Sequence, residues 1–340
     1  MRVIRAINQS DRLLSTVKNQ SSRLSPGLKN LIANSNGIVG YGRSDPIDLN
    51  QSKSFEMRLR ELIERFDKTC GDQRLRPSTW IILSTATIVS LNRPSAFKPL
   101  WSLVSGGFKD RIDRSECVEL IRESSLKSIS FIGIPKSINA LNRFNEIVSL
   151  DSDSTSSDHQ TSKQHQVDRG RRSYQESYNS SSAEIYNRGL RLWKSVYDPL
   201  SERLIAKLSD SNPDLPNHII LSHYGHLLSD PTERPGPLGR VATSLVAIGA
   251  LRSSNELGPQ LLSHVLGLKK AFNPTIDGDE DQIRRLSKDS LGDGVDWLLR
   301  DEGVSWIIES IDQLVALVHQ TESSIIKSSN LTKHQSFSKL

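Results

Sequence analysis

The feature that most constrains the fold of this 340-residue chain is the spacing of its apolar side chains, which recur every three or four positions in one segment after another. This spacing places the apolar residues on one face of a helix. A half-buried strand requires strict alternation instead, and the sequence shows no sustained alternation. The chain is therefore expected to be all-α, with its helices packed against one another.

The clearest pattern lies within residues 237–272, where two helical stripes meet at a short polar turn. The first stripe ends near Gly249 and the second begins at Leu257. His264 falls on the apolar stripe of the second helix and is expected to be buried. A histidine in such a position is more often a core residue than a catalyst, so periodicity alone does not assign it a function.

Shifts in composition divide the chain into six segments. A serine-rich run with little to bury separates two helical regions, and polar stretches flank them. The predicted segments are a polar, largely disordered N-terminal extension (1–50), a first helical unit (51–150), a serine-rich linker (151–182), a second helical unit (183–275), C-terminal helices (276–320) and a flexible tail (321–340).

Composition argues against several classes of function. The net charge of +5 is spread over nearly equal numbers of acids and bases, and no basic stripe is interleaved with aromatic residues, so no nucleic-acid partner is expected. No apolar run approaches the roughly 20 residues that cross a bilayer, so no membrane span is expected. Cys70 and Cys117 are far apart and form no CxxC pair, so neither a disulfide framework nor a zinc site is predicted.

The two ends of the chain carry competing targeting signals. The last three residues, Ser338, Lys339 and Leu340, form the S-K-L tripeptide that the peroxisomal import receptor binds. The first 23 residues are rich in Arg, Lys and Ser with Asp11 as their single acid, a weaker pattern that is similar to a mitochondrial transit peptide. Peroxisomal import through that receptor is the favoured expectation, and a mitochondrial location is the alternative.

Three histidines form a second group of candidate functional residues. On a helix expected from about Leu215, His223 and His226 share one face, with His218 close by. No carboxylate or cysteine stands at a matching spacing, and a metal ion usually needs three or four such ligands. Metal binding is therefore not favoured, and we expect these side chains to approach His264 across the helical core instead.

Several motifs occur in a fixed order along the chain. They are YNRG from Tyr186, HYGHLLSD from His223, LGRVATSLVAIGAL from Leu238 and NELGPQLLSHVLGLKKA from Asn255, preceded by RSECVELIRESSLKSISFIGIPKSINALNRF from Arg114. In this order they resemble the carboxymuconolactone decarboxylase family of the AhpD-like superfamily. The resemblance implies an AhpD-like helical fold with two related helical units. It also implies a homo-oligomer, because family members commonly assemble through their helical faces.

The resemblance implies a site as well. The family pattern has an arginine before an apolar helix, a Glu-Leu pair after a short turn and a histidine on the next helix, which correspond to Arg240, Glu256 and His264. In these roles His264 is the general acid or base, Glu256 orients it and Arg240 holds a substrate carboxylate. His223 and Tyr224 are expected to contact the substrate from the neighbouring helix.

The sequence departs from the peroxidases of the superfamily. Those enzymes carry a CxxC pair one turn before the histidine, whereas Leu257 and Gln260 occupy the two positions here, so dithiol peroxide reduction is opposed. The remaining expectation is an acid–base enzyme that needs no bound cofactor and acts on a small carboxylated or lactone substrate. The alternative is a degenerate, non-catalytic helical interaction protein.

Overall fold

The computed structural model of the chain describes residues 24–33, 49–107, 112–155, 180–229, 238–254, 257–273 and 280–337, with the backbone alone at 49–52, 152–155 and 320–337. Every regular element within these residues is a helix, which confirms the all-α class. None of the described helices combines the length and the apolar character that crossing a bilayer requires.

The helices fall into two groups along the chain. The first comprises α2 (Pro26–Ala33), α3 (Leu49–Asp72), α4 (Ser78–Ser90), the 3-10 helix η2 (Pro94–Ala96), α5 (Phe97–Gly107), α6 (Arg114–Lys127), α7 (Ile129–Ile132) and α8 (Ile134–Thr155). The second comprises α10 (Ser182–Tyr197), α11 (Ser201–Ser211), α12 (Leu215–His218), the π-helix η3 (Ile219–Leu228), α13 (Arg240–Arg252), α14 (Gly258–Lys269), α15 (Glu280–Leu291), α16 (Val295–Leu298) and α17 (Asp301–Phe337).

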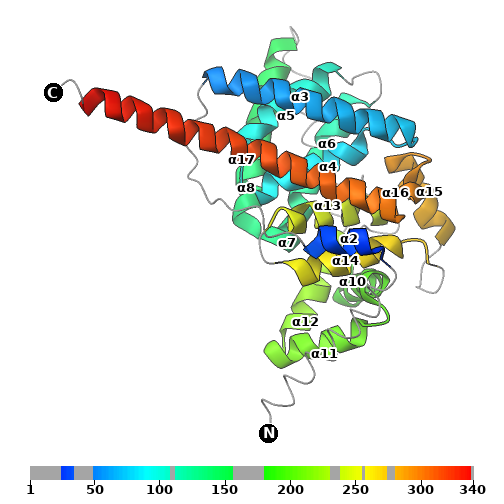
Figure 1. The fold of residues 1–340 in the computed structure, drawn as a ribbon. Helices are drawn as coiled ribbons and strands as arrows, with labels where there is room; N and C mark the ends of the chain where they lie inside the picture. The colour runs from blue at the N-terminus through cyan, green and yellow to red at the C-terminus, as the bar shows by residue number, and fades with distance from the viewer. Residues whose placement is uncertain are drawn as a thin grey trace.

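Two buried helices form the centre of the molecule. Every residue of α4 is buried, and so is every residue of α13 after Arg240, as expected of helices surrounded by other helices. The two pack against each other, and α17 contacts both. On the outer side α3 runs along α17 (Figure 1).

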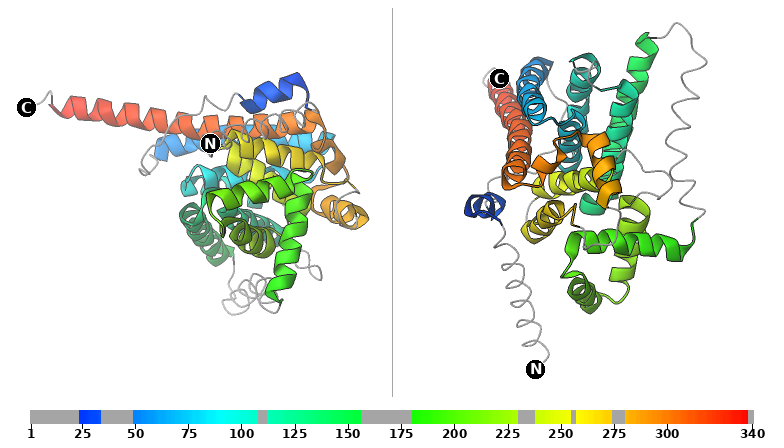
Figure 2. Two further views of the ribbon diagram at one scale, coloured as in Figure 1. Left: turned by 90° about the horizontal axis from the view of Figure 1, so that it is seen from below. Right: turned by 90° about the vertical axis from the view of Figure 1, so that its right-hand side faces the viewer.

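A smaller layer, formed by α10, α11, α12 and η3, lies at one end of the molecule (Figures 1 and 2). It has its own apolar cluster of Trp193, Ile220, Tyr224 and Leu228. Phe131 of α7 packs against both this cluster and the main core. The boundary between the two clusters is the place where most of the predicted site residues gather.

The order of helices from α4 to α8 recurs from α13 to α17. The helices α4 and α13 both have 13 residues, and α7 and α16 both have 4. The helices α5 and α14 contain LWSLVSG from Leu100 and LLSHVLG from Leu261, which share Leu, Ser, Val and Gly in one register. The second repeat therefore runs from α13 through α15, α16 and α17. The segments predicted from composition instead place residues 276–320 in a separate C-terminal segment.

Two polar segments contain more helix than the sequence predicts. Within the N-terminal extension α2 buries Leu28 and Ile32 against the main core, because an i, i+4 apolar pair suffices to dock a short helix. At the other end α17 continues to Phe337, through residues predicted as a flexible tail. Extending a helix that has already formed costs far less than nucleating a new one, which explains this continuation.

Candidate functional site

A contact between two glycines joins α10 to the π-helix η3. The start of α10 is fixed by a capping box, in which Ser181 and Glu184 bond to each other's backbone N–H groups. A Cβ at Gly189 would lie 2.6 Å from the backbone nitrogen of Gly225, and a Cβ at Gly225 would lie 2.5 Å from a carbonyl oxygen of α10. The YNRG and HYGH motifs thus meet through their glycines, with α10 directly against η3.

The backbone spacing of the π-helix sets the directions of the side chains in the HYGH motif. Its i→i+5 pattern is seen where the backbone nitrogen of Ser229 donates to the carbonyl of Tyr224 over 3.1 Å. Tyr224 is buried against α10. His223 is half-buried elsewhere, with its Nδ1 3.1 Å from Oγ of Ser130. His223 is not among the residues that line the two cavities, and its expected contact with a substrate stays a prediction.

The π-helix also changes how the three histidines pair. Residues five apart lie above one another in such a helix, and the rings of His218 and His223 meet edge to face with centroids 5.6 Å apart. The expectation that His223 and His226 share a face assumes α-helical spacing and does not hold here. Within the described part of the chain, no three His, Cys, Asp or Glu side chains are grouped so that they could hold a metal ion.

His264 belongs to a chain of hydrogen bonds with the partly buried Tyr197 and the buried Tyr224. Oη of Tyr197 lies 3.3 Å from Nε2 of His264 and 2.9 Å from Oη of Tyr224. The rings of Phe131 and Tyr197 pack edge to face against the imidazole, with centroids 5.2 and 5.9 Å away. His264 is only 5% exposed, so solvent does not screen this network.

Arg240, the first residue of α13, donates four hydrogen bonds to neutral oxygen atoms. Its Nε donates to Oγ of Ser195 over 2.8 Å, and its Nη2 donates to the carbonyls of Ser195 and Gly267 over 3.2 and 3.0 Å. Nη1 donates to Oγ of Ser244. A guanidinium has five N–H groups, so one Nη1 donor has no protein acceptor among the described residues. No carboxylate among the described residues forms an ion pair with this partly buried cation.

Burial fixes the protonation states of the network. Together with the positive charge of Arg240, which has the smaller effect, burial lowers the pKa of His264 to about 3. Burial also raises the pKa of Tyr197 to about 12 and that of Tyr224 well above its usual value. Desolvation lowers the pKa of Arg240 to about 10. At neutral pH the site therefore contains a charged guanidinium, a neutral imidazole and two protonated phenols.

Two cavities adjoin at Arg240. The inner cavity, beside His264 and Tyr224, has a volume of about 10 Å³, which is room for about one water molecule. The outer cavity has a volume of about 240 Å³ and lies between α10, the end of η3, the start of α13, residues 270–273 and α15. Leu228, Arg240 and Thr243 are among the side chains that line both.

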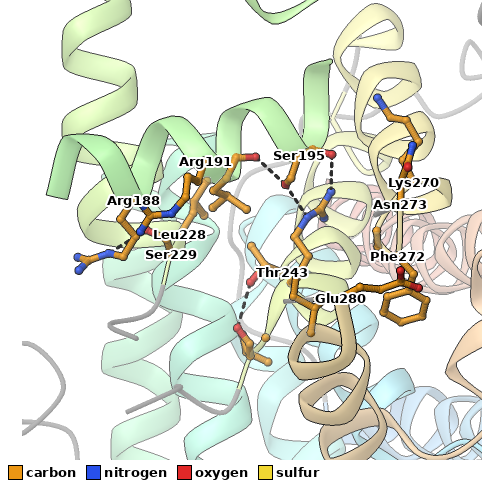
Figure 3. Close-up of a pocket in the computed structure, with 16 residues that line it drawn as sticks. Arg188, Arg191, Ser195, Leu228, Ser229, Thr243, Lys270, Phe272, Asn273 and Glu280 are labelled. Carbon is orange, nitrogen blue, oxygen red and sulfur yellow. Dashed lines mark hydrogen bonds between the residues drawn. The ribbon is translucent and has the colours of Figure 1, made fainter. Parts of the chain in front are cut away.

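The outer cavity is rich in basic side chains. Among the described residues, Arg188, Arg191, Arg240 and Lys270 line it with a single acid, Glu280, whose carboxylate accepts a hydrogen bond from an arginine of its own helix. Figure 3 shows the two sides of the cavity, with Arg188, Arg191 and Ser229 on one and Lys270, Phe272 and Asn273 on the other. A recess of this size and charge suits a small organic anion.

The structure brings three of the predicted site residues together. Arg240, Tyr224 and His264 surround the inner cavity. Glu256 lies outside the described residues, as does the C-terminal tripeptide 338–340, so the roles assigned to them stay predictions.

Sequence reasoning missed several groups of the site. Ser195 lies in none of the quoted motifs, Lys270 lies in the last of them without an assigned role, and Tyr197 is identified from the sequence only as a residue of an apolar helix face. The signal that points to Tyr197 is the stripe Gly189, Trp193, Tyr197, spaced by four residues, which begins at the glycine of the YNRG motif. A phenol at the end of such a stripe needs a buried partner, and His264 and Tyr224 supply it.

Comparison with protein-family models, with curated proteins and with solved structures finds no match to this chain. The resemblance to the carboxymuconolactone decarboxylase family therefore rests on the motif residues alone. The family enters the functional argument as a proposal.

Proposed function

We propose that the outer cavity binds a small organic carboxylate through Arg240. The observation that carries the proposal is the bonding of this guanidinium, which is partly buried, donates only to neutral oxygens among the described residues and keeps one N–H donor unused there. A buried cation without a counter-ion is costly, and an anionic ligand with a planar carboxylate offsets that cost through charge-assisted hydrogen bonds.

The reaction class proposed for this site is cofactor-independent acid–base chemistry of the carboxymuconolactone decarboxylase type. A ligand carboxylate beside Arg240 offsets the positive charge that helps to lower the pKa of His264, so ligand binding makes the imidazole a stronger base. Tyr197 and Tyr224 then form a path of hydroxyl groups along which a proton can move to or from His264. The substrate in this scheme is a small keto acid or lactone with a carboxylate.

The binding step is tested with benzoate and its uncharged analogue benzamide, followed by isothermal titration calorimetry. Benzoate is expected to bind the wild type at least about tenfold more tightly than benzamide, and Arg240→Met is expected to remove that preference. Arg252→Met is the matched control, because Arg252 is a buried cation of the same helix about 18 Å from Arg240. Equal benzoate binding by Arg240→Met and the wild type would refute the proposal.

A second candidate is a non-catalytic protein that only binds the anion. The observation in its favour is the size of the inner cavity, which at about 10 Å³ has room for about one water molecule and is too small for a substrate molecule beside His264 in this conformation. Deuterium exchange into 4-oxopentanoate, followed by NMR in D₂O, separates the two candidates. An acid–base enzyme accelerates exchange next to the ketone and loses this effect in His264→Gln, whereas a binding protein binds the compound without exchange.

The proposed location is the peroxisome, on the strength of the tripeptide Ser338, Lys339 and Leu340. A fluorescent fusion at the N-terminus leaves this tripeptide accessible and is expected to give peroxisomal puncta. Deleting Leu340 from the same fusion is expected to abolish them. A mitochondrial or diffuse signal from the intact fusion would exclude this address.

A homo-oligomer is proposed from the family resemblance only. Sedimentation equilibrium of the full chain tests it directly, and a mass of one chain at micromolar concentration would rule it out.

A further inference from the structure

Lys127, the last residue of α6, is a fully buried lysine beside the wall of the outer cavity. Its side chain has no exposed surface. The ammonium Nζ donates to the carbonyl of Leu228 over 3.0 Å, to the carbonyl of Leu238 over 3.2 Å and to Oγ1 of Thr243 over 3.3 Å. Glu123 of the same helix is farther from it, at 3.8 Å, and lies partly in solvent.

These three acceptors belong to the lining of the proposed anion site. Leu228 is the last residue of η3, Leu238 lies just before α13, and all three residues line the outer cavity. Thr243 also donates its hydroxyl to the carbonyl of Leu238 over 3.2 Å, as the dashed line at Thr243 in Figure 3 shows. One ammonium group therefore fixes the end of the π-helix relative to the start of α13, directly behind the cavity wall.

Packing alone does not account for a lysine at this position. Desolvating an ammonium is expensive, and an apolar side chain of similar volume is often as stable or more stable in such a place. A positive charge next to a recess that binds an anion has a second effect, because the Coulomb attraction acts through a medium of low dielectric.

We propose that Lys127 is a positioning residue of the anion site, which holds the cavity wall in shape and strengthens the binding of a ligand carboxylate without touching it. This inference rests on the proposed binding of carboxylates in the outer cavity. It assigns to α6, in the first half of the chain, a part in a site built otherwise from the second half.

The test compares the affinities of benzoate and benzamide for the wild type, Lys127→Met and the control Arg252→Met, with urea unfolding of each protein alongside. Lys127→Met is expected to bind benzoate at least about tenfold more weakly than the wild type, the scale of one lost charge near a partly dehydrated site, with a smaller change for benzamide. The change at Arg252, about 18 Å along α13 from Arg240, is expected to alter stability but not the preference for benzoate.

A second variant keeps the test decisive where Lys127→Met does not fold. Thr243→Val removes one acceptor of Nζ at nearly constant volume and is expected to weaken benzoate binding measurably. If Lys127→Met binds benzoate as tightly as the wild type, the proposed role of Lys127 is overturned and the carboxylate site stays intact. Where Lys127→Met does not fold, the same result with Thr243→Val overturns it. Absence of benzoate binding by the wild type would refute the proposed function itself.

Discussion

The position of His264 on α14 corresponds, in the register shared by the two repeats, to Leu103 on α5, and both side chains are buried. The first residue of α13 is Arg240, whereas the first residue of α4 is Ser78. At these two positions, helices α5 and α4 carry Leu103 and Ser78, whereas helices α14 and α13 carry His264 and Arg240. An imidazole and a guanidinium cost more to desolvate than a leucine and a serine, which agrees with the ligand binding that we propose for this site.

The neutral, buried state of His264 predicts a loss of stability in acid. In the unfolded chain the imidazole takes up a proton near pH 6.5, but in the folded protein its pKa is about 3, so between these values only the unfolded state binds the proton. The free energy of unfolding is then expected to fall by up to about 1.4 kcal/mol per pH unit as the pH drops through this window. Urea unfolding at pH 7 and pH 5 measures the loss.

The same experiment on His264→Gln isolates this residue. Without the titrating imidazole, the variant is expected to lose less stability than the wild type between pH 7 and pH 5. Gln260→Ala serves as the control because Gln260 is an exposed residue of the same helix that carries no titrating group, and its loss should match that of the wild type. An identical slope for His264→Gln and the wild type would show that the imidazole is not held neutral.

Cys117 provides a separate test of the argument against peroxide reduction. Burial, together with the nearby charges of Glu116 and Asp113, raises the pKa of its thiol to about 12. The thiolate is the reactive form, and Cys70 is buried too, so neither thiol of the native protein is expected to react with Ellman's reagent at pH 8. Both should react in urea, and rapid reaction of one thiol in the native state would reopen the peroxidase hypothesis.

Among the elements, the π-helix η3 depends on its backbone contact with α10. Gly225→Ala places a methyl group 2.5 Å from a carbonyl oxygen of α10, so the helices must separate, at an expected cost of about 2–4 kcal/mol in the free energy of unfolding. Gly106→Ala is the control, since no atom lies within 4 Å of the added methyl group and alanine favours helix. Equal stability of the two variants in urea would contradict the close contact.

The elements also show how far sequence reasoning reaches. Helices α4 and α13 could be predicted because their apolar residues are dense and begin beside proline or glycine. The π-helix could not, because the helical template assumes 3.6 residues per turn and HYGH carries no mark of another spacing. In this helix Tyr224 lines the inner cavity, whereas His223 is not among the residues that line either cavity. Pairs such as Tyr197 with His264, 67 positions apart, follow only from the packed fold.

Across the whole molecule, Arg252 joins three helices that are distant in the sequence. Its Nε and Nη2 donate to both carboxylate oxygens of Asp312 in α17 over 2.7 Å, and its Nη1 donates to the carbonyl of Ile32 in α2 over 3.4 Å. Nearby, the backbone nitrogen of Ser25 donates to Asp301 at the start of α17 over 2.7 Å. These contacts hold the N-terminal helix α2 to the core, although composition places it in a polar extension.

The Arg252–Asp312 pair predicts an asymmetry between its two single variants. Arg252 is 4% exposed, whereas the side chain of Asp312 keeps 28% of its surface in contact with solvent. Asp312→Ala leaves a buried guanidinium without its counter-ion and is expected to cost about 3 kcal/mol or more. Arg252→Met fills the same space without a charge and leaves a carboxylate that water can reach, so its cost should be nearer 1 kcal/mol. Urea unfolding at pH 7 measures both, and equal costs would mean that water reaches the arginine as readily as the aspartate.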